Sequence, residues 1–354
     1  MPDLYSMLRP FIGCVQAETA HNMALWALKR RLVSGAPFSD PVLETNLWGR
    51  DFANPIGLAA GFDKNADVPM QALALGFGFV EIGSVTPRPQ AGNPKPRLFR
   101  LDEDEGVVNR MGFNSKGVDY TAANLSALPP TRGLGIIGVN LGKNKETEDA
   151  AADYVIGIEK LAQYADYMVI NVSSPNTPGL RALQDKAELE VLVSRVRDVL
   201  DKTVPTNTPP LLVKVAPDLT DDDIADIAAV AGSSAVDGLI ATNTTIDRPA
   251  SLINASKSEG GGLSGKPLMK PSTKILSDLY KATNGQVPLI GVGGIMSGAD
   301  AYDKIRAGAS LVQFYSSMVY EGQSLPGRMC RTLAGLLKRD GFEHVDDAVG
   351  ADHR

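Results

Sequence analysis

Eight short runs of apolar residues recur along the sequence, and stretches with helical spacing separate each run from the next. The runs are rich in Val, Ile and Leu, as buried parallel strands are, and their alternation with helices is typical of repeated βα units. Eight such units predict an α/β fold with a closed (β/α)8 barrel, a TIM barrel, rather than an open sheet. The expected strands span residues 55–60, 79–83, 136–139, 167–172, 211–215, 238–242, 289–292 and 311–315.

Long insertions follow the second and the sixth of these strands. Within the first insertion, residues 97–100 and 106–109 each have the character of a short strand, so extra β structure over the barrel mouth is expected, in the position of a lid. Residues 1–40 differ in style from the remainder. The chain is therefore divided into an N-terminal helical hairpin, 1–40, and a barrel, 41–354.

Two amphipathic helices are expected in residues 1–35. The first has all its apolar residues on one face: Leu4, Met7, Leu8, Phe11, Ile12 and Val15. The second is expected to begin near Thr19 as its cap, with its apolar stripe ahead of a basic cluster at 29–31: Ala24, Leu25, Leu28 and Leu32. Such a hairpin can pack on the protein core or lie in a lipid headgroup layer. Trp26 and the basic cluster favour the membrane, and the residues leave both readings open.

Composition excludes several classes of protein. A formal net charge of −6 gives no broad basic field for a phosphate backbone, so no nucleic acid is expected as partner. Cys14 and Cys330 are too few for a disulfide framework, and no apolar run reaches the length of a membrane span. The three histidines, His21, His344 and His353, lie outside the strand ends. Neither a metal centre nor a Ser–His nucleophile pair is therefore expected.

Polar and glycine residues follow each predicted strand, at the barrel end where active sites of this fold are assembled. In chain order they are Gly61-Phe62-Asp63-Lys64, Ser84, Asn140, Asn171 to Thr177, Lys214, Thr242-Asn243-Thr244, Gly293-Gly294 and Tyr315-Ser316. An isolated Asn or Ser in a loop is commonly a turn residue. Eight such positions in register indicate a single site.

The residue types at this site suggest a phosphate-bearing cofactor and an amide-rich substrate. Barrel enzymes often hold a phosphate between the loops after strands seven and eight, where Gly293, Gly294, Tyr315 and Ser316 lie. Four asparagines offer donors and acceptors that complement a cyclic ureide: Asn109, Asn171, Asn176 and Asn243. Lys64 can pair with a substrate carboxylate, and Lys214 can neutralise negative charge on a reduced cofactor. For either lysine taken alone, a solvated or salt-bridged side chain is the commoner explanation.

Several blocks of the sequence resemble class 2, quinone-dependent dihydroorotate dehydrogenases, in order along almost the whole chain. They are NPIGLAAGFDK at 54–64, GSVTPRPQ at 83–90, NRMGFN at 109–114, NVSSPNT at 171–177, GLSGKP at 262–267, GVGG at 291–294 and GADHR at 350–354. The resemblance implies oxidation of (S)-dihydroorotate to orotate in de novo pyrimidine (UMP) biosynthesis. FMN would be the hydride acceptor at the barrel mouth, and a membrane quinone the final electron acceptor.

The resemblance also implies roles for individual residues. Ser174 would be the base that removes the C5 proton while hydride leaves C6 for the flavin N5; class 1 relatives place a cysteine there. The substrate would be held by Lys64, Asn109, Arg110, Met111, Gly112, Phe113, Asn171, Asn176, Asn243 and Thr244. FMN would contact Ala60, Gly61, Phe62, Asp63, Lys64, Ser84, Asn140, Asn171, Lys214, Thr242, Gly265, Gly294, Tyr315 and Ser316. The quinone would lie near His21, Arg100 and Tyr315.

By the same resemblance, residues 1–35 would lie on a membrane surface and guide the quinone to the flavin. The expected location is peripheral, on the cytoplasmic side of a bacterial inner membrane. Two alternatives of other classes stay open. One is an FMN barrel dehydrogenase that uses a soluble acceptor, NAD or fumarate. The other is a non-catalytic membrane-bound barrel.

Overall fold

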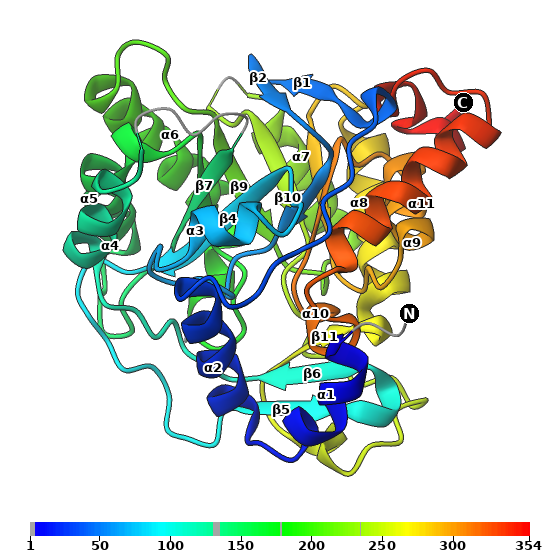
Figure 1. The fold of residues 1–354 in the computed structure, drawn as a ribbon. Coiled ribbons are helices and arrows are strands. Elements are labelled where there is room, and N and C mark those ends of the chain that lie inside the picture. The colour runs from blue at the N-terminus through cyan, green and yellow to red at the C-terminus, as the bar shows by residue number, and fades with distance from the viewer. Residues whose placement is uncertain (1–3, 130–134, 178, 234) are drawn as a thin grey trace.

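Eight parallel strands close into a barrel in the computed structural model, which describes residues 4–129, 135–177, 179–233 and 235–354 (Figure 1). The barrel strands are β3 (Ile56–Leu58), β4 (Phe79–Val85), β7 (Ile136–Leu141), β8 (Tyr167–Asn171), β9 (Leu211–Val215), β10 (Gly238–Ala241), β12 (Leu289–Val292) and β13 (Leu311–Phe314). Each overlaps one of the eight predicted runs. The (β/α)8 prediction is therefore confirmed.

Helices surround the barrel, and the longer ones bury an apolar stripe. Along α6, Leu189, Val193, Val196 and Leu200 recur every three or four residues and are buried, as the helical period requires. The surrounding helices are α3 (Pro69–Leu73), α4 (Val118–Ser126), α5 (Ala150–Leu161), α6 (Lys186–Thr203), α7 (Asp221–Ala231), α8 (Met269–Ala282), α9 (Gly298–Arg306), α10 (Met318–Glu321) and α11 (Leu325–Arg339). Short 3-10 turns span Pro41–Leu43, Asp102–Asp104, Ala162–Tyr164, Leu180–Gln184, Ala255–Ser258, Lys266–Leu268, Val345–Ala348 and Ala351–His353.

A β-hairpin, β1 (Thr45–Leu47) and β2 (Arg50–Phe52), closes the amino-terminal end of the barrel. Phe52 packs edge-on against Phe79 with ring centroids 5.5 Å apart. Trp48 Nε1 donates to the carbonyl of Asp237 at 2.9 Å. Figure 1 shows this hairpin at the end of the barrel opposite to α1 and α2, which leaves the other end for the site.

The two long insertions meet in a second sheet over the carboxyl end of the barrel. Strands β5 (Leu98–Leu101) and β6 (Gly106–Asn109) come from the first insertion, and β11 (Gly262–Gly265) comes from the second. The three strands pair antiparallel in the order β11-β6-β5. The extra β structure expected over the barrel mouth is thus present, and it gains a third strand from the distant insertion.

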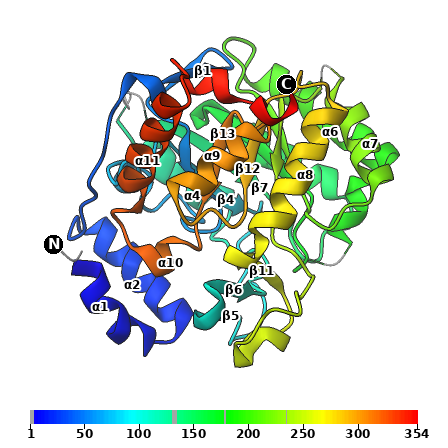
Figure 2. The ribbon, with the colours of Figure 1, turned by 90° about the vertical axis from the view of Figure 1, so that its right-hand side faces the viewer.

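The N-terminal hairpin lies beside this sheet. Its helices are α1 (Leu4–Gly13) and α2 (Ala17–Lys29), and both views place them next to β5 and β6 (Figures 1 and 2). The expected cap at Thr19 was wrong: Gln16 caps α2, and its side-chain oxygen accepts the Thr19 N–H at 2.9 Å. The helix begins at Ala17, earlier than expected, so the N–H of Thr19 is itself one of the free groups of the first turn and is satisfied by the Gln16 side chain. The division of the chain at residue 40 stays a prediction.

Of the apolar stripe predicted for α1, the side chains of Leu4, Met7 and Leu8 lie outside the described part of the structure. In the described ranges, no helix has both the length and the apolar character needed to cross a membrane.

Candidate active site

A cavity of about 660 Å³ lies at the carboxyl end of the barrel, between the strand ends, the β5–β6–β11 sheet and helix α2. This volume is typical of cofactor and ligand sites. Most residues singled out from the sequence line it: Ala60, Gly61, Phe62, Lys64, Ser84, Asn109, Met111, Gly112, Phe113, Asn171, Ser174, Asn176, Lys214, Thr242, Asn243, Thr244, Gly265, Gly294, Tyr315, Ser316, His21 and Arg100. Seven of the eight barrel strands therefore contribute residues to one space, and β7 does not line it.

Three of the singled-out residues do not line this cavity. Arg110 turns outward, pairs with Glu259 at 2.7 Å and covers the Phe99 ring. The buried Asp63 carboxylate accepts backbone N–H groups of residues 65, 67 and 68 and holds the loop after β3 in shape. Asn140 lies one layer below the cavity, where Ser84 Oγ donates to its side-chain oxygen. These three residues are therefore better placed to support the site than to contact a ligand directly.

A network of polar side chains links four strand ends, those of β4, β7, β8 and β10, at the floor of the cavity. Asn171 Nδ2 donates to Ser84 Oγ at 3.0 Å and to Asn140 Oδ1 at 3.3 Å. Its oxygen accepts Nδ2 of Asn243 at 3.1 Å, which also donates to Ser173 Oγ at 3.0 Å. Because each group is bonded to the next, the amides hold fixed orientations before any ligand arrives.

The deepest layer of the site is a buried carboxylate that the sequence analysis missed. Glu81, only 1% exposed, lies 3.6 Å from Lys214 Nζ. Its oxygens also accept Nδ2 of Asn140 at 2.8 Å, Nε2 of Gln313 at 2.8 Å and the Tyr167 hydroxyl at 3.2 Å. Glu81 and Gln313 were both recognisable as polar residues inside otherwise apolar strands. Gln313 orients Glu81, and Glu81 pairs with Lys214, whose side chain lines the cavity.

Ser174 lies in the loop after β8, is 6% exposed and lines the cavity. Its Oγ accepts the backbone N–H of Asn176 at 3.3 Å. The Asn176 amide in turn donates to the backbone and side-chain oxygens of Asn109 at 3.1 and 3.3 Å. These contacts tie the Ser174 loop to strand β6 of the covering sheet, so the two close over the same space.

Lys64 supplies a second cation. Its Nζ donates to the carbonyl of Gly61 at 2.6 Å across the loop after β3. Burial, and then the neighbouring Arg97 guanidinium, lower the pKa of Lys64 to about 8. At neutral pH the ammonium is still the main form, although burial limits its contact with solvent. Such a group favours an anionic ligand.

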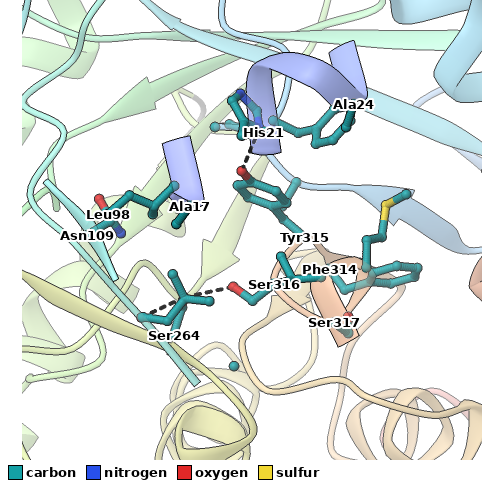
Figure 3. Close-up of a pocket in the computed structure, with 18 of the residues that line it drawn as sticks. Ala17, His21, Ala24, Leu98, Asn109, Ser264, Phe314, Tyr315, Ser316 and Ser317 are labelled. Atoms are coloured by element: carbon teal, nitrogen blue, oxygen red, sulfur yellow. Dashed lines mark hydrogen bonds between the residues drawn. The ribbon is translucent and has the colours of Figure 1, made fainter. Parts of the chain in front are cut away.

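Glycines form the part of the cavity after β12. A Cβ on Gly294 would lie 2.2 Å from the backbone nitrogen of Met269, and one on Gly265 would lie 2.4 Å from the Glu105 carbonyl oxygen. Only glycine therefore fits at either position. Nearby, the Ser264 and Ser316 hydroxyls are 2.7 Å apart (Figure 3). The buried Ser317 hydroxyl, from a residue that also lines the cavity, has no hydrogen-bond partner among the described residues.

At the outer part of the cavity, helix α2 presents His21 to the barrel. His21 Nδ1 is 3.0 Å from the Tyr315 hydroxyl, and Figure 3 shows the two side chains facing each other across the space. Burial, followed by the charge of Lys64, lowers the pKa of His21 to about 4, whereas burial raises the pKa of Tyr315. Both groups are therefore neutral at pH 7.

Two arginines of the first insertion hold the hairpin in place. Arg100 donates to the carbonyls of Ile12, Gly13 and Val15 at the turn between α1 and α2. Arg97, which the sequence analysis missed as a partner, forms a buried ion pair with Glu18 at 2.8 Å. No local pattern in the sequence indicates that these two residues meet.

Comparisons with known proteins were made once this geometry was established. Residues 42–337 match the family model described as dihydroorotate dehydrogenase. The chain is 58% identical over 355 residues to a protein of Rhodospirillum rubrum named dihydroorotate dehydrogenase (quinone), with 100% of this chain and 96% of the relative covered. It is 50% identical over 374 residues to the mitochondrial protein of that name from Arabidopsis thaliana, with 98% and 81% covered.

The fold is similar to solved structures as well. The crystal structure of DHODH from Eimeria tenella in complex with ferulenol matches with a TM-score of 0.91 at 45% identity, covering 96% of each chain. The ligand-free structure from the same organism matches with a TM-score of 0.90 at 46% identity, covering 95% of this chain and 99% of the other.

The buried pair beneath the cavity gives a first prediction. Replacing Glu81 with Ala leaves Lys214 buried without its carboxylate, which should lower the free energy of unfolding by about 3–5 kcal/mol. Urea-induced unfolding followed by circular dichroism measures the change. Glu190→Ala, at an exposed position on α6, is the control and should change it by less than about 0.5 kcal/mol. Equal effects of the two substitutions would contradict the stabilising role of Glu81.

Proposed function

The chain belongs to the dihydroorotate dehydrogenase family, and we propose on that basis that it oxidises (S)-dihydroorotate to orotate in pyrimidine biosynthesis and passes the electrons to a quinone. The observation that carries the proposal is the shared cavity. Ser174, Lys64 and the asparagines that follow different barrel strands all line it. A carboxylate-bearing ureide ring needs this combination: one cation for the carboxylate, amides for the ring, and a proton acceptor above it.

FMN is the cofactor that the donor set fits. The glycine-lined part of the cavity, with the unpartnered Ser317 hydroxyl, suits a phosphate group. Lys214, paired with Glu81 below, suits the flavin ring, because a fixed cation stabilises negative charge that reduction adds. When bound, FMN would accept hydride from the substrate and release electrons to the quinone. The residues that would hold FMN are Ala60, Gly61, Ser84, Asn171, Thr242, Gly265, Gly294, Tyr315 and Ser316.

The protein's own contribution to the oxidation is to bind, orient and deprotonate the substrate. Lys64 would pair with the carboxylate, and Asn109, Asn171, Asn176 and Asn243 would bind the ring. Ser174 would take the C5 proton at Oγ while its own hydroxyl proton passes on to water. The Asn176 N–H donates to this oxygen and would stabilise the negative charge that develops on it as the hydroxyl proton leaves. The β5–β6–β11 sheet covers the cavity and limits the entry of water.

The N-terminal hairpin suits a membrane surface and a quinone path. Phe11, Met23, Trp26 and Leu32 are 57–73% exposed, next to the exposed basic residues 29–31. Amphipathic segments with this composition bind anionic lipid headgroups. The inner side of the same hairpin lines the cavity up to His21 and Tyr315, near Arg100. A quinone that enters from the membrane would reach the flavin here. The protein would then be peripheral, on the cytoplasmic side of a bacterial inner membrane.

The choice of electron acceptor tests the proposed reaction. The purified full-length protein is expected to oxidise dihydroorotate with a short-chain quinone analogue and to show no comparable turnover with NAD or fumarate. Steady-state orotate formation, followed by absorbance, measures this. Efficient turnover with either soluble acceptor would overturn the assignment to the quinone-dependent class.

Ser174→Ala should slow the reductive half-reaction by about 10²- to 10⁴-fold, because the proton acceptor is lost while the binding groups remain. Stopped-flow absorbance of the bound flavin after mixing with dihydroorotate gives the rate. Bound FMN and the dissociation constant of orotate should stay as in the unmodified protein. Ser174→Cys, which restores an acceptor, should recover part of the rate. An undiminished rate in the Ala variant would mean that another group is the base.

The exposed apolar residues of the hairpin can be tested without touching the cavity, because neither Phe11 nor Trp26 lines it. The double substitution F11S/W26S should weaken binding to anionic lipid vesicles by about 10- to 100-fold, as expected for two large side chains withdrawn from the bilayer. Sedimentation with vesicles gives the bound fraction. Dihydroorotate-driven flavin reduction should not change. Val191→Ser, at a 66% exposed position on α6, is the control. If it weakens vesicle binding as much as F11S/W26S does, the hairpin has no specific membrane role.

A further inference from the structure

Lys304 of helix α9 is a fully buried lysine, with 0% of its surface exposed. Its Nζ donates to Ser272 Oγ at 2.8 Å and to Thr273 Oγ1 at 2.9 Å, both on helix α8. In the described ranges, no carboxylate lies within 4.0 Å of this ammonium. Asp300, one helical turn earlier, directs its carboxylate to the Met296 N–H at 3.0 Å and the Ser297 hydroxyl at 2.9 Å instead.

A buried ammonium held only by hydroxyls is energetically unfavourable, because two neutral hydrogen bonds do not replace the water that a full charge loses on burial. Burial lowers the pKa of Lys304 to about 7. Buried lysines usually have an acidic partner, and no other residue of the described chain supplies one. A negative charge bound nearby would stabilise the ammonium form.

The surroundings of Lys304 indicate where that charge binds. Ser272 Oγ, which accepts from Lys304, donates to the carbonyl of Gly293 at 3.0 Å. A Cβ on Gly293 would lie 2.8 Å from the same hydroxyl. The first turn of α8 thus packs directly on the back of Gly293 and Gly294, whose other side lines the cavity. Lys304 lies one side chain behind the glycine-lined end of the site.

We propose that Lys304 is the positioning residue that supplies the countercharge for the flavin phosphate, acting through Ser272 from behind the Gly293–Gly294 turn rather than by direct contact. The inference rests on the proposed use of FMN. A phosphate monoester carries between one and a half and two negative charges at neutral pH. It is the one part of FMN that riboflavin lacks. Lys304 should therefore determine how strongly the site prefers FMN to riboflavin, and it should have no effect on binding of the isoalloxazine ring.

A competition experiment tests this on the FMN-loaded, full-length protein. The protein is equilibrated with graded concentrations of riboflavin, free flavin is removed, and bound FMN and riboflavin are quantified by chromatography. In Lys304→Met the FMN-to-riboflavin selectivity should fall by about 10- to 100-fold, which a unit charge can contribute across a few ångströms of protein. Lys304→Gln removes the same charge but keeps a side chain that can hydrogen-bond to Ser272 and Thr273. If the Met variant does not fold, the Gln variant is used for the same measurement.

The control is Lys143→Met. Lys143 is also buried, at 8% exposure, but it donates to the Thr147 carbonyl at 2.8 Å and does not line the cavity. Its selectivity should match that of the unmodified protein. Unchanged selectivity in both Lys304 variants would overturn the inference, and so would equal weakening of FMN and riboflavin, since that indicates general damage to the fold. If the unmodified protein holds no flavin at all, the proposed function itself fails.

Discussion

All eight barrel strands run parallel, so every carboxyl end lies at the same rim, and the rest of the structure depends on this constraint. The residues that follow the strands are far apart in the chain, yet the topology brings most of them to one shared cavity. The two insertions, after β4 and after β10, leave from the same rim and pair with each other above it. The hairpin is then fixed to that sheet by Arg97 and Arg100. The cavity, the sheet that covers it and the hairpin beside it all result from this one topology.

The charges around the cavity suit anionic ligands, although the protein as a whole is acidic. The formal net charge is −6, but three lysines lie in or directly behind the cavity wall. Lys64 borders the space, Lys214 is balanced by Glu81, and Lys304 has no acidic partner among the described residues. Each would be placed against a different negative charge: a substrate carboxylate, a reduced ring and a phosphate. The buried location keeps these cations from being screened by salt and makes each of them selective.

The strands and most of the residues that line the cavity could be predicted from the sequence. Buried parallel strands are continuous apolar runs, and the active-site residues of this fold follow them. It did not reveal contacts between distant segments, such as β11 with β6 or Glu18 with Arg97, since no local pattern encodes them. Gln16 rather than Thr19 caps α2, because the helix begins at Ala17 and the N–H of Thr19 is already part of its first turn. Glu81 was overlooked even though a carboxylate within Phe79–Val85 is out of place in a buried strand unless it has a partner.

The central claim is that the strand ends enclose one flavin against one dihydroorotate molecule. The most direct measurement is the visible absorption spectrum of the purified full-length protein, recorded without oxygen before and after addition of (S)-dihydroorotate. The account predicts about one FMN per chain and bleaching of its absorbance as orotate appears. A protein that neither carries nor takes up FMN, or whose bound flavin keeps its colour with excess substrate, would contradict it.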